Sequence, residues 1–145
     1  MKYYFAYGSN LNLTQMNSRC PESRKIGRSM LNGYRLRFCK HHKTEHGYMT
    51  IEKADNICVP IGIFEISDND ENILDRKEGV TCHCYRKEMI DVDFNGEKVN
   101  GLVYIMENPK KAIPQKDYYE RVKQGYKDFE FDLSYLEEAR RECEN

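Results

Sequence analysis

The sequence predicts an α+β fold in which short helices accompany a barrel-like sheet. Six segments show the alternating or nearly continuous apolar pattern that is typical of β-strands. These segments lie close to one another along the chain, which favours a barrel-like sheet, and shorter segments with helix-capping residues lie beside them. At 145 residues the chain is long enough to bury the core of one domain, so we expect a single domain over residues 1–145.

The strongest local signal is a hairpin turn at Asn95-Gly96. The two central residues of such a turn take left-handed backbone conformations, which Asn and Gly tolerate better than other residues. The turn joins the last two of the expected strands. The full set is expected at residues 2–6, 35–39, 48–52, 59–66, 85–93 and 98–106.

Capping residues set the expected helix boundaries. Ser67 followed by Asp70 forms a capping-box pattern, and Gly79 is placed to end that helix in a left-handed conformation. Pro114 is expected to start a later helix, and Asp132 to cap the last one. The four expected helices are residues 12–19, 68–77, 114–125 and 133–143.

The composition argues against several classes of partner. The chain has 23 Lys and Arg against 24 Asp and Glu, so we expect no face basic enough to bind nucleic acid by releasing counterions. The apolar run at residues 3–7 is shorter than a secretory signal, and no stretch approaches the roughly 20 apolar residues of a membrane span. We therefore expect a cytoplasmic protein with no nucleic-acid or membrane partner, whose six cysteines remain thiols.

A turn directly after the first expected strand is the first candidate for chemistry. It consists of Tyr7, Gly8, Ser9, Asn10 and Leu11. The glycine permits close backbone approaches, and successive backbone N–H groups at the start of a helix form a concavity that binds anions such as a carboxylate. The same residues also fit a connecting turn that only caps the next helix, through Asn10 or Asn12.

The second candidate is Glu78, at the expected end of the helix that Gly79 terminates. The C-terminal end of a helix is electronegative, and a cleft would remove water from the carboxylate, so both effects raise its pKa toward neutrality. A carboxylate with such a pKa can accept and return protons in catalysis. The alternative is a solvated glutamate at a helix end that has no role in function.

Cysteines and histidines form the third candidate, as ligands for zinc. They are Cys39, His41, His42 and His46, with Cys82, His83 and Cys84 further along the chain. Their spacings match no tetrahedral template, and adjacent histidines on a strand would point to opposite faces. We therefore expect no metal site. A nucleophilic Cys/His pair has no local signature here, although the sequence leaves it open.

Two separated segments resemble specific motifs of the gamma-glutamylcyclotransferase-like family. The first is residues 4–11, and the second is residues 74–80, followed by Tyr85 seven residues after Glu78. Residues 31–38 and 47–51 are similar to the stretches between them, so the resemblance covers nearly the whole chain. The chain departs from the family pattern at Pro60-Ile61, at residues 130–132 and in having no tryptophan, which puts substrate identity in doubt more than reaction class.

The resemblance implies a mixed β-barrel with peripheral helices and a cavity beside the turn at residues 7–11. It also implies an enzyme that cyclises a gamma-glutamyl amino acid or amine to 5-oxoproline and releases the amino acid or amine. Glu78 would be the general acid/base, and Tyr7 and Tyr85 would line the pocket and donate hydrogen bonds. The backbone N–H groups that would hold the substrate α-carboxylate are those of Gly8, Ser9, Asn10 and Leu11. No cofactor or metal is needed for these steps.

Two alternatives remain at this point. One is an enzyme on the same scaffold that removes a gamma-glutamyl group during the biosynthesis of an amine. The other is a non-enzymatic module that binds a small acidic ligand, although Glu78 would hinder such binding. The sequence leaves open the leaving group and whether the chain is a monomer or a homodimer.

Overall fold

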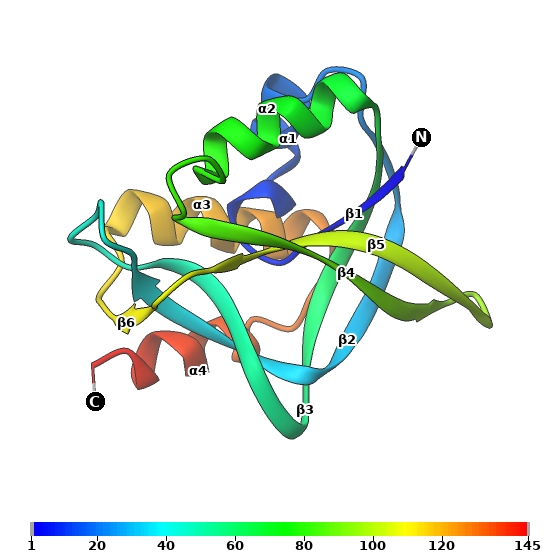
Figure 1. Cartoon of the computed structure of the whole chain (residues 1–145). Coiled ribbons are helices and arrows are strands. Elements are labelled where there is room, and N and C mark those ends of the chain that lie inside the picture. Colours follow the sequence, from blue (N-terminus) through cyan, green and yellow to red (C-terminus); the bar gives the residue numbers. More distant parts are fainter. Residues whose placement is uncertain (1, 145) are drawn as a thin grey trace.

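The computed structural model describes residues 2–144 and contains one mixed sheet with helices around it (Figure 1). The strand order is β4-β5-β1-β3-β2-β6, and β1 pairs in parallel with β5 while the other neighbours are antiparallel. The strands are β1 Lys2–Ala6, β2 Arg24–Lys40, β3 Tyr48–Ile66, β4 Tyr85–Phe94, β5 Glu97–Met106 and β6 Lys110–Lys111. The predicted α+β fold is confirmed. The sheet is a curled half-barrel, because its edge strands β4 and β6 do not pair with each other in the described residues.

Strands β2 and β3 are much longer than the sequence predicts, at 17 and 19 residues. The expected strands at 48–52 and 59–66 are the two ends of one continuous strand. The residues between them are largely exposed, and only Lys53 and Cys58 pair with β2, so residues 54–57 lie outside the β2–β3 pairing. Register shifts between Lys25 and Gly27, and between Asn32 and Tyr34, interrupt the pairing and let the long hairpin bend.

The helices are short and lie at the periphery of the sheet (Figure 1). They are the 3-10 helix η1 Ser9–Leu11, α1 Leu13–Arg19, α2 Asp68–Glu78, α3 Lys116–Asp128 and α4 Ser134–Glu142. Asn12 caps α1, since its Oδ1 accepts a hydrogen bond from Gln15 N at 3.0 Å. The capping box of Ser67 and Asp70 is present, and Gly79 ends α2 with a φ of 67°. The hairpin turn is also confirmed, with φ values of 52° at Asn95 and 81° at Gly96.

The predicted boundaries of α3 and the predicted N-cap of α4 are wrong, whereas the end of α4 lies at the predicted place. Helix α3 begins at Lys116, two residues after Pro114, and continues three residues past Gly125. Gly125 is needed inside the helix because a Cβ there would lie 2.6 Å from Asn12 N and 2.7 Å from Leu11 C. Helix α4 begins at Ser134, and Asp132 Oδ1 accepts a hydrogen bond from Ser134 N at 2.9 Å without being the N-cap residue.

The core consists of the side chains that the curled sheet and the helices enclose. Its largest fully buried members include Phe5, Phe38, Phe64, Tyr126 and Phe129. Within residues 2–144, no helix combines the length and apolar character required to cross a membrane.

The close approach of α3 to η1 leads to a prediction for Gly125→Ala. An alanine inside a helix normally stabilises a protein by roughly 0.5–1 kcal/mol relative to glycine. Here the added Cβ meets backbone atoms that cannot rotate away, and such overpacking typically costs about 1–3 kcal/mol. We therefore expect the variant to lose stability in urea unfolding, whereas Lys127→Ala, on an exposed side of the same helix, should stay within about 0.5 kcal/mol of the parent. A Gly125→Ala protein at least as stable as the parent would contradict the packing described.

Candidate active site

A cavity of about 320 Å³ opens beside the turn that follows β1. Its walls come from β1 and that turn, the end of α1, the turn after β2 and the start of β3, the end of α2, the start of β4, β5 and α3. The lining is unusually rich in tyrosine. The lining tyrosines are Tyr4, Tyr7, Tyr48, Tyr85, Tyr104 and Tyr118.

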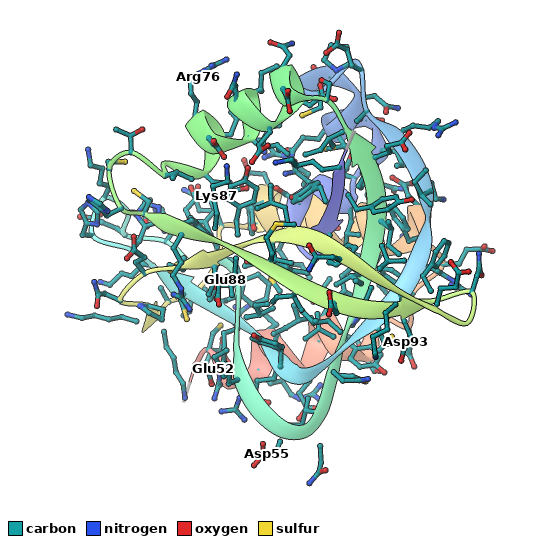
Figure 2. The ribbon with its side chains drawn as sticks, turned by 45° about the vertical axis from the view of Figure 1, so that its right-hand side comes forward. Glu52, Asp55, Arg76, Lys87, Glu88 and Asp93 are labelled. Carbon is teal, nitrogen blue, oxygen red and sulfur yellow. The ribbon has the colours of Figure 1, made fainter. Side chains whose placement is uncertain are left out.

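Helix α2 brings Glu78 to this cavity and is anchored to the sheet beneath it. Lys87 on β4 forms salt bridges with Glu71 and Asp75 of α2, and Tyr104 Oη on β5 donates a hydrogen bond to Asp75 Oδ1 at 2.7 Å. Figure 2 shows Lys87 in the space between β4 and α2. The last residue of the anchored helix is Glu78, and the left-handed Gly79 then turns the chain away.

The Glu78 carboxyl group is half-buried and faces the cavity. Burial raises its pKa to about 7, and the positive charge of Arg19 opposes this rise. The direction agrees with the sequence-based expectation. Burial is the main cause of the shift.

Tyr7 and Tyr85 line the cavity, but both hydroxyl groups already donate their proton to a hydrogen bond within the protein. Tyr7 Oη donates to the carbonyl oxygen of Tyr104, and Tyr85 Oη donates to the carbonyl oxygen of Met49 at 2.9 Å. Burial, with a further contribution from the charge of Glu78, raises the pKa of both phenols well above the ordinary value. Both therefore stay protonated and present only lone pairs to the cavity, which differs from the expectation that they donate hydrogen bonds to a substrate.

Tyr4 and Tyr118 have the opposite hydrogen-bond arrangement. Tyr118 Oη accepts a hydrogen bond from Met49 N at 3.0 Å, and Tyr4 Oη accepts one from Asn10 Nδ2 at 3.0 Å. Burial and the charge of Glu78 raise the pKa of both phenols, so each retains a proton that it can donate. Sequence reasoning did not identify either as a donor, because no local pattern distinguishes Tyr118 from its neighbour Tyr119.

The turn after β1 contributes Gly8, Ser9 and Asn10 to the cavity wall. Among residues 2–144, no hydrogen-bond acceptor pairs with the backbone N–H groups of these three residues. Leu11 does not join them, because its side chain is fully buried and its N–H donates to Gly8 O at 3.0 Å. Gly8 is required for a close approach, since a Cβ there would lie 2.9 Å from the Cβ of Met49.

Cationic side chains surround the cavity. Arg19 lies within it, and Lys43, Lys77 and Arg121 are exposed around it. In the described part of the chain, none of the four forms a salt bridge, and Glu78 is the only carboxylate in the lining. The charges of this site therefore suit a ligand with more than one negative group.

The reasoning from strand geometry against a metal site is wrong in one respect. Strand β2 ends at Lys40, so His41 and His42 lie in a turn and do not point to opposite faces of a sheet. Their ligand atoms and that of Cys84 lie within 4.8 Å of one another, whereas Cys39 and His46 are not in this group.

Comparisons with known proteins agree with this architecture. The family model described as "Gamma-glutamyl cyclotransferase, AIG2-like" matches residues 4–128. The human gamma-glutamylcyclotransferase is 28% identical over 143 residues, covering 94% of this chain and 76% of the human protein. A crystal structure of an uncharacterized human protein has a TM-score of 0.87 at 26% identity, covering 96% of this chain and 86% of that one.

A solved gamma-glutamyl cyclotransferase has a TM-score of 0.86 at 25% identity, with coverage of 96% and 86%. The Bacillus subtilis protein YkqA shares the fold, with a TM-score of 0.79 at 21% identity over 99% of this chain and 54% of its own. The family match, the curled mixed sheet and the cavity at the turn after β1 agree with one another, and the chain belongs to the gamma-glutamyl cyclotransferase, AIG2-like family.

Proposed function

We propose that the protein is a gamma-glutamylcyclotransferase that converts a gamma-glutamyl amino acid to 5-oxoproline and releases the amino acid. The observation that carries this proposal is Glu78, a carboxyl group with a pKa of about 7 in a cavity lined by tyrosines and cationic side chains. The family membership supports the same reaction type.

Glu78 is proposed to move the protons of the ring closure. The substrate α-ammonium loses a proton to the Glu78 carboxylate, and the resulting amine attacks the γ-carbonyl carbon of the same molecule. A C–N bond forms to the α-nitrogen, the bond to the leaving nitrogen breaks, and the Glu78 carboxylic acid returns a proton to that nitrogen. Intramolecular attack needs little beyond a folded substrate and a proton carrier, and a carboxyl group with a pKa near the working pH suits that task.

The hydrogen bonds that each tyrosine makes within the protein determine whether its hydroxyl group accepts from the substrate or donates to it. The lone pairs of Tyr7 and Tyr85 are placed to accept from the substrate ammonium before it transfers its proton. Tyr118 retains a proton to donate to the γ-carbonyl oxygen, which becomes negative as the ring closes. Tyr4 has the same capacity, and Asn10 fixes its hydroxyl group.

Two groups of positive charge are proposed to bind the two carboxylates of such a substrate. The N–H groups of Gly8, Ser9 and Asn10, with Arg19 beside them, would hold the α-carboxylate of the glutamyl part. The exposed Lys77 and Arg121 would attract the carboxylate of the leaving amino acid. A gamma-glutamyl amine lacks this second carboxylate, so the charges favour an amino acid as the leaving group.

Glu78→Gln tests the reaction and the role of Glu78 together. The parent should release 5-oxoproline and a free amino acid from a gamma-glutamyl amino acid, with no free glutamate. Its kcat/KM should fall as the pH drops through about 7, because protonation removes the base. The variant should lose about 10²–10⁴-fold in kcat, since an amide cannot accept the proton. Release of glutamate would mean that water is the nucleophile, and a folded variant with normal turnover would remove Glu78 from the mechanism.

The stability of the same variant separates a catalytic from a structural loss. Folding raises the Glu78 pKa from 4.5 to about 7, so the charged carboxylate costs stability above pH 7 and this cost disappears as the pH falls toward 4.5. Glu78→Gln should therefore be more stable than the parent at pH 8, by about 1–3 kcal/mol after allowing for partial exposure, and equal to it near pH 4. An inactive variant that is less stable at pH 8 would show that Glu78 holds the fold.

Tyr118→Phe tests the proposed donor, with Tyr119→Phe as a matched control one residue away. Tyr119 packs against Phe38 and does not line the cavity. Loss of a donor to the developing oxyanion typically costs about 10²–10³-fold in kcat. We expect a loss of this size for Tyr118→Phe and near-parent turnover for Tyr119→Phe. Similar kinetics in the two variants would exclude Tyr118 as the donor.

Arg121→Gln and Lys77→Gln test the preference for a second carboxylate. Exposed ion pairs contribute roughly 0–1 kcal/mol, so each variant should raise KM for a gamma-glutamyl amino acid by up to about fivefold at low salt. KM for a gamma-glutamyl amine should not change, and Lys127→Gln, outside the cavity, should leave both values unchanged. Equal effects on the two substrates would show that these cations do not recognise the leaving group.

A further inference from the structure

We propose that His41, His42 and Cys84 bind a zinc ion at the margin of the cavity. The ligand atoms of the first three residues all lie within 4.8 Å of one another. Cys82 is outside this group, although its sulfur atom is 3.2 Å from that of Cys84. Two imidazoles and one thiol are donors that zinc favours, and a water molecule would take the fourth position. The site is separate from the groups assigned to ring closure.

Two loops from distant parts of the chain bring these residues together. The first follows β2, where a turn closed by Thr44 N and His41 O at 3.1 Å presents the two histidines. The second lies between α2 and β4, where His83 has a φ of 60° and Cys84 N donates to Gly79 O at 3.0 Å. Since each loop is held by its own hydrogen bonds, the fold positions the donors before any ion binds.

The distances leave only a small adjustment for metal binding. Ligand atoms around a tetrahedral zinc ion are about 3.3–3.8 Å apart, given bonds of about 2.0 Å to nitrogen and about 2.3 Å to sulfur. The three principal donors, mutually within 4.8 Å, must move together by at most about 1–1.5 Å on this geometry. His41 Nδ1 accepts a hydrogen bond from Lys43 N at 3.2 Å, and coordination by His41 would replace this long contact. Zinc deprotonates a coordinating thiol, and the released proton goes to solvent.

A zinc ion bound at this site would restrict access to the cavity. His41 and Cys84 both line it, Tyr85 follows Cys84 directly, and the rings of His41 and Tyr85 are 6.0 Å apart. An ion bound to both loops would tie them together beside Glu78 and restrict the exchange of substrate and product. We therefore expect zinc to inhibit turnover; this consequence, unlike the binding site itself, rests on the proposed function.

Metal binding can be measured without any assay of turnover. Cobalt(II) is added to the protein in a non-thiol reductant that keeps all six cysteines as thiols, and the visible spectrum is recorded. We expect sulfur-to-cobalt charge-transfer bands and tetrahedral d–d bands at one equivalent, and displacement of the cobalt by zinc. His42→Asn should weaken zinc binding by more than about 10–100-fold, the loss seen for residues that only support a ligand.

His83→Asn is the matched control. His83 lies between the two cysteines, its side chain is 84% exposed and it is outside the ligand group. Asn tolerates its left-handed conformation, so this variant should bind zinc as the parent does. The site is disproved if the parent shows no tetrahedral cobalt spectrum, or if His42→Asn and His83→Asn bind zinc equally.

A measurement of turnover tests the expected inhibition by zinc separately from zinc binding. His42 does not line the cavity, so His42→Asn should turn over substrate like the parent in the presence of a chelator. Added zinc should inhibit the parent and His83→Asn but not His42→Asn. Binding without inhibition would keep the metal site and reject its effect on turnover. Absence of turnover in every protein, with a normal cobalt spectrum, would reject the proposed function and leave the metal site standing.

Discussion

The pairing of β1 with both β3 and β5 is the constraint on which the rest of the molecule depends. β1 has only five residues, yet it joins the long β2–β3 hairpin to the β4–β5 hairpin. Its parallel contact with β5 requires Gly101, because a Cβ there would lie 2.3 Å from the fully buried ring of Phe5. With these strands in contact, the turn after β1 meets Tyr104 on β5 and Met49 on β3, which form two walls of the cavity.

The pKa of Glu78 depends on a balance between burial and the charge of a neighbouring cation. Enclosure by aromatic residues raises the pKa of this carboxyl group, while Arg19 keeps the rise moderate. A carboxylate paired directly with an arginine would be too weak a base, and one without a nearby cation would hold its proton too tightly. The anchoring of α2 through Lys87 keeps Glu78 at this position, so ion pairs between β4 and α2 support the placement of a half-buried carboxyl group in the cavity.

Met49 shows how backbone hydrogen bonds set the polarity of the site. Its carbonyl oxygen accepts the proton of Tyr85, and its N–H group donates to the oxygen of Tyr118. One residue of β3 therefore makes one phenol an acceptor and the other a donor. Two tyrosine side chains acquire opposite hydrogen-bonding capacities because one binds the carbonyl oxygen of Met49 and the other binds its N–H group.

Short stretches of the sequence determined several turns and helix ends of this protein, and its family. The capping box at Ser67, the left-handed Gly79 and the Asn95-Gly96 turn were predictable because each depends on a few consecutive residues. The motif at residues 4–11 and the segment around Glu78 were sufficient to indicate the family.

Other features depended on contacts between segments far apart in the chain, and only the tertiary structure decided them. Residues 24–34 of β2 contain one buried side chain, that of Leu31, so pairing with β3 rather than a buried face determines their strand conformation. The position of Gly125 inside α3 reflects the backbone of Leu11 and Asn12, more than 100 residues earlier. The hydrogen bond between Met49 and Tyr118 and the approach of His41 to Cys84 likewise arise where distant segments meet, a relation that spacing along the chain does not encode.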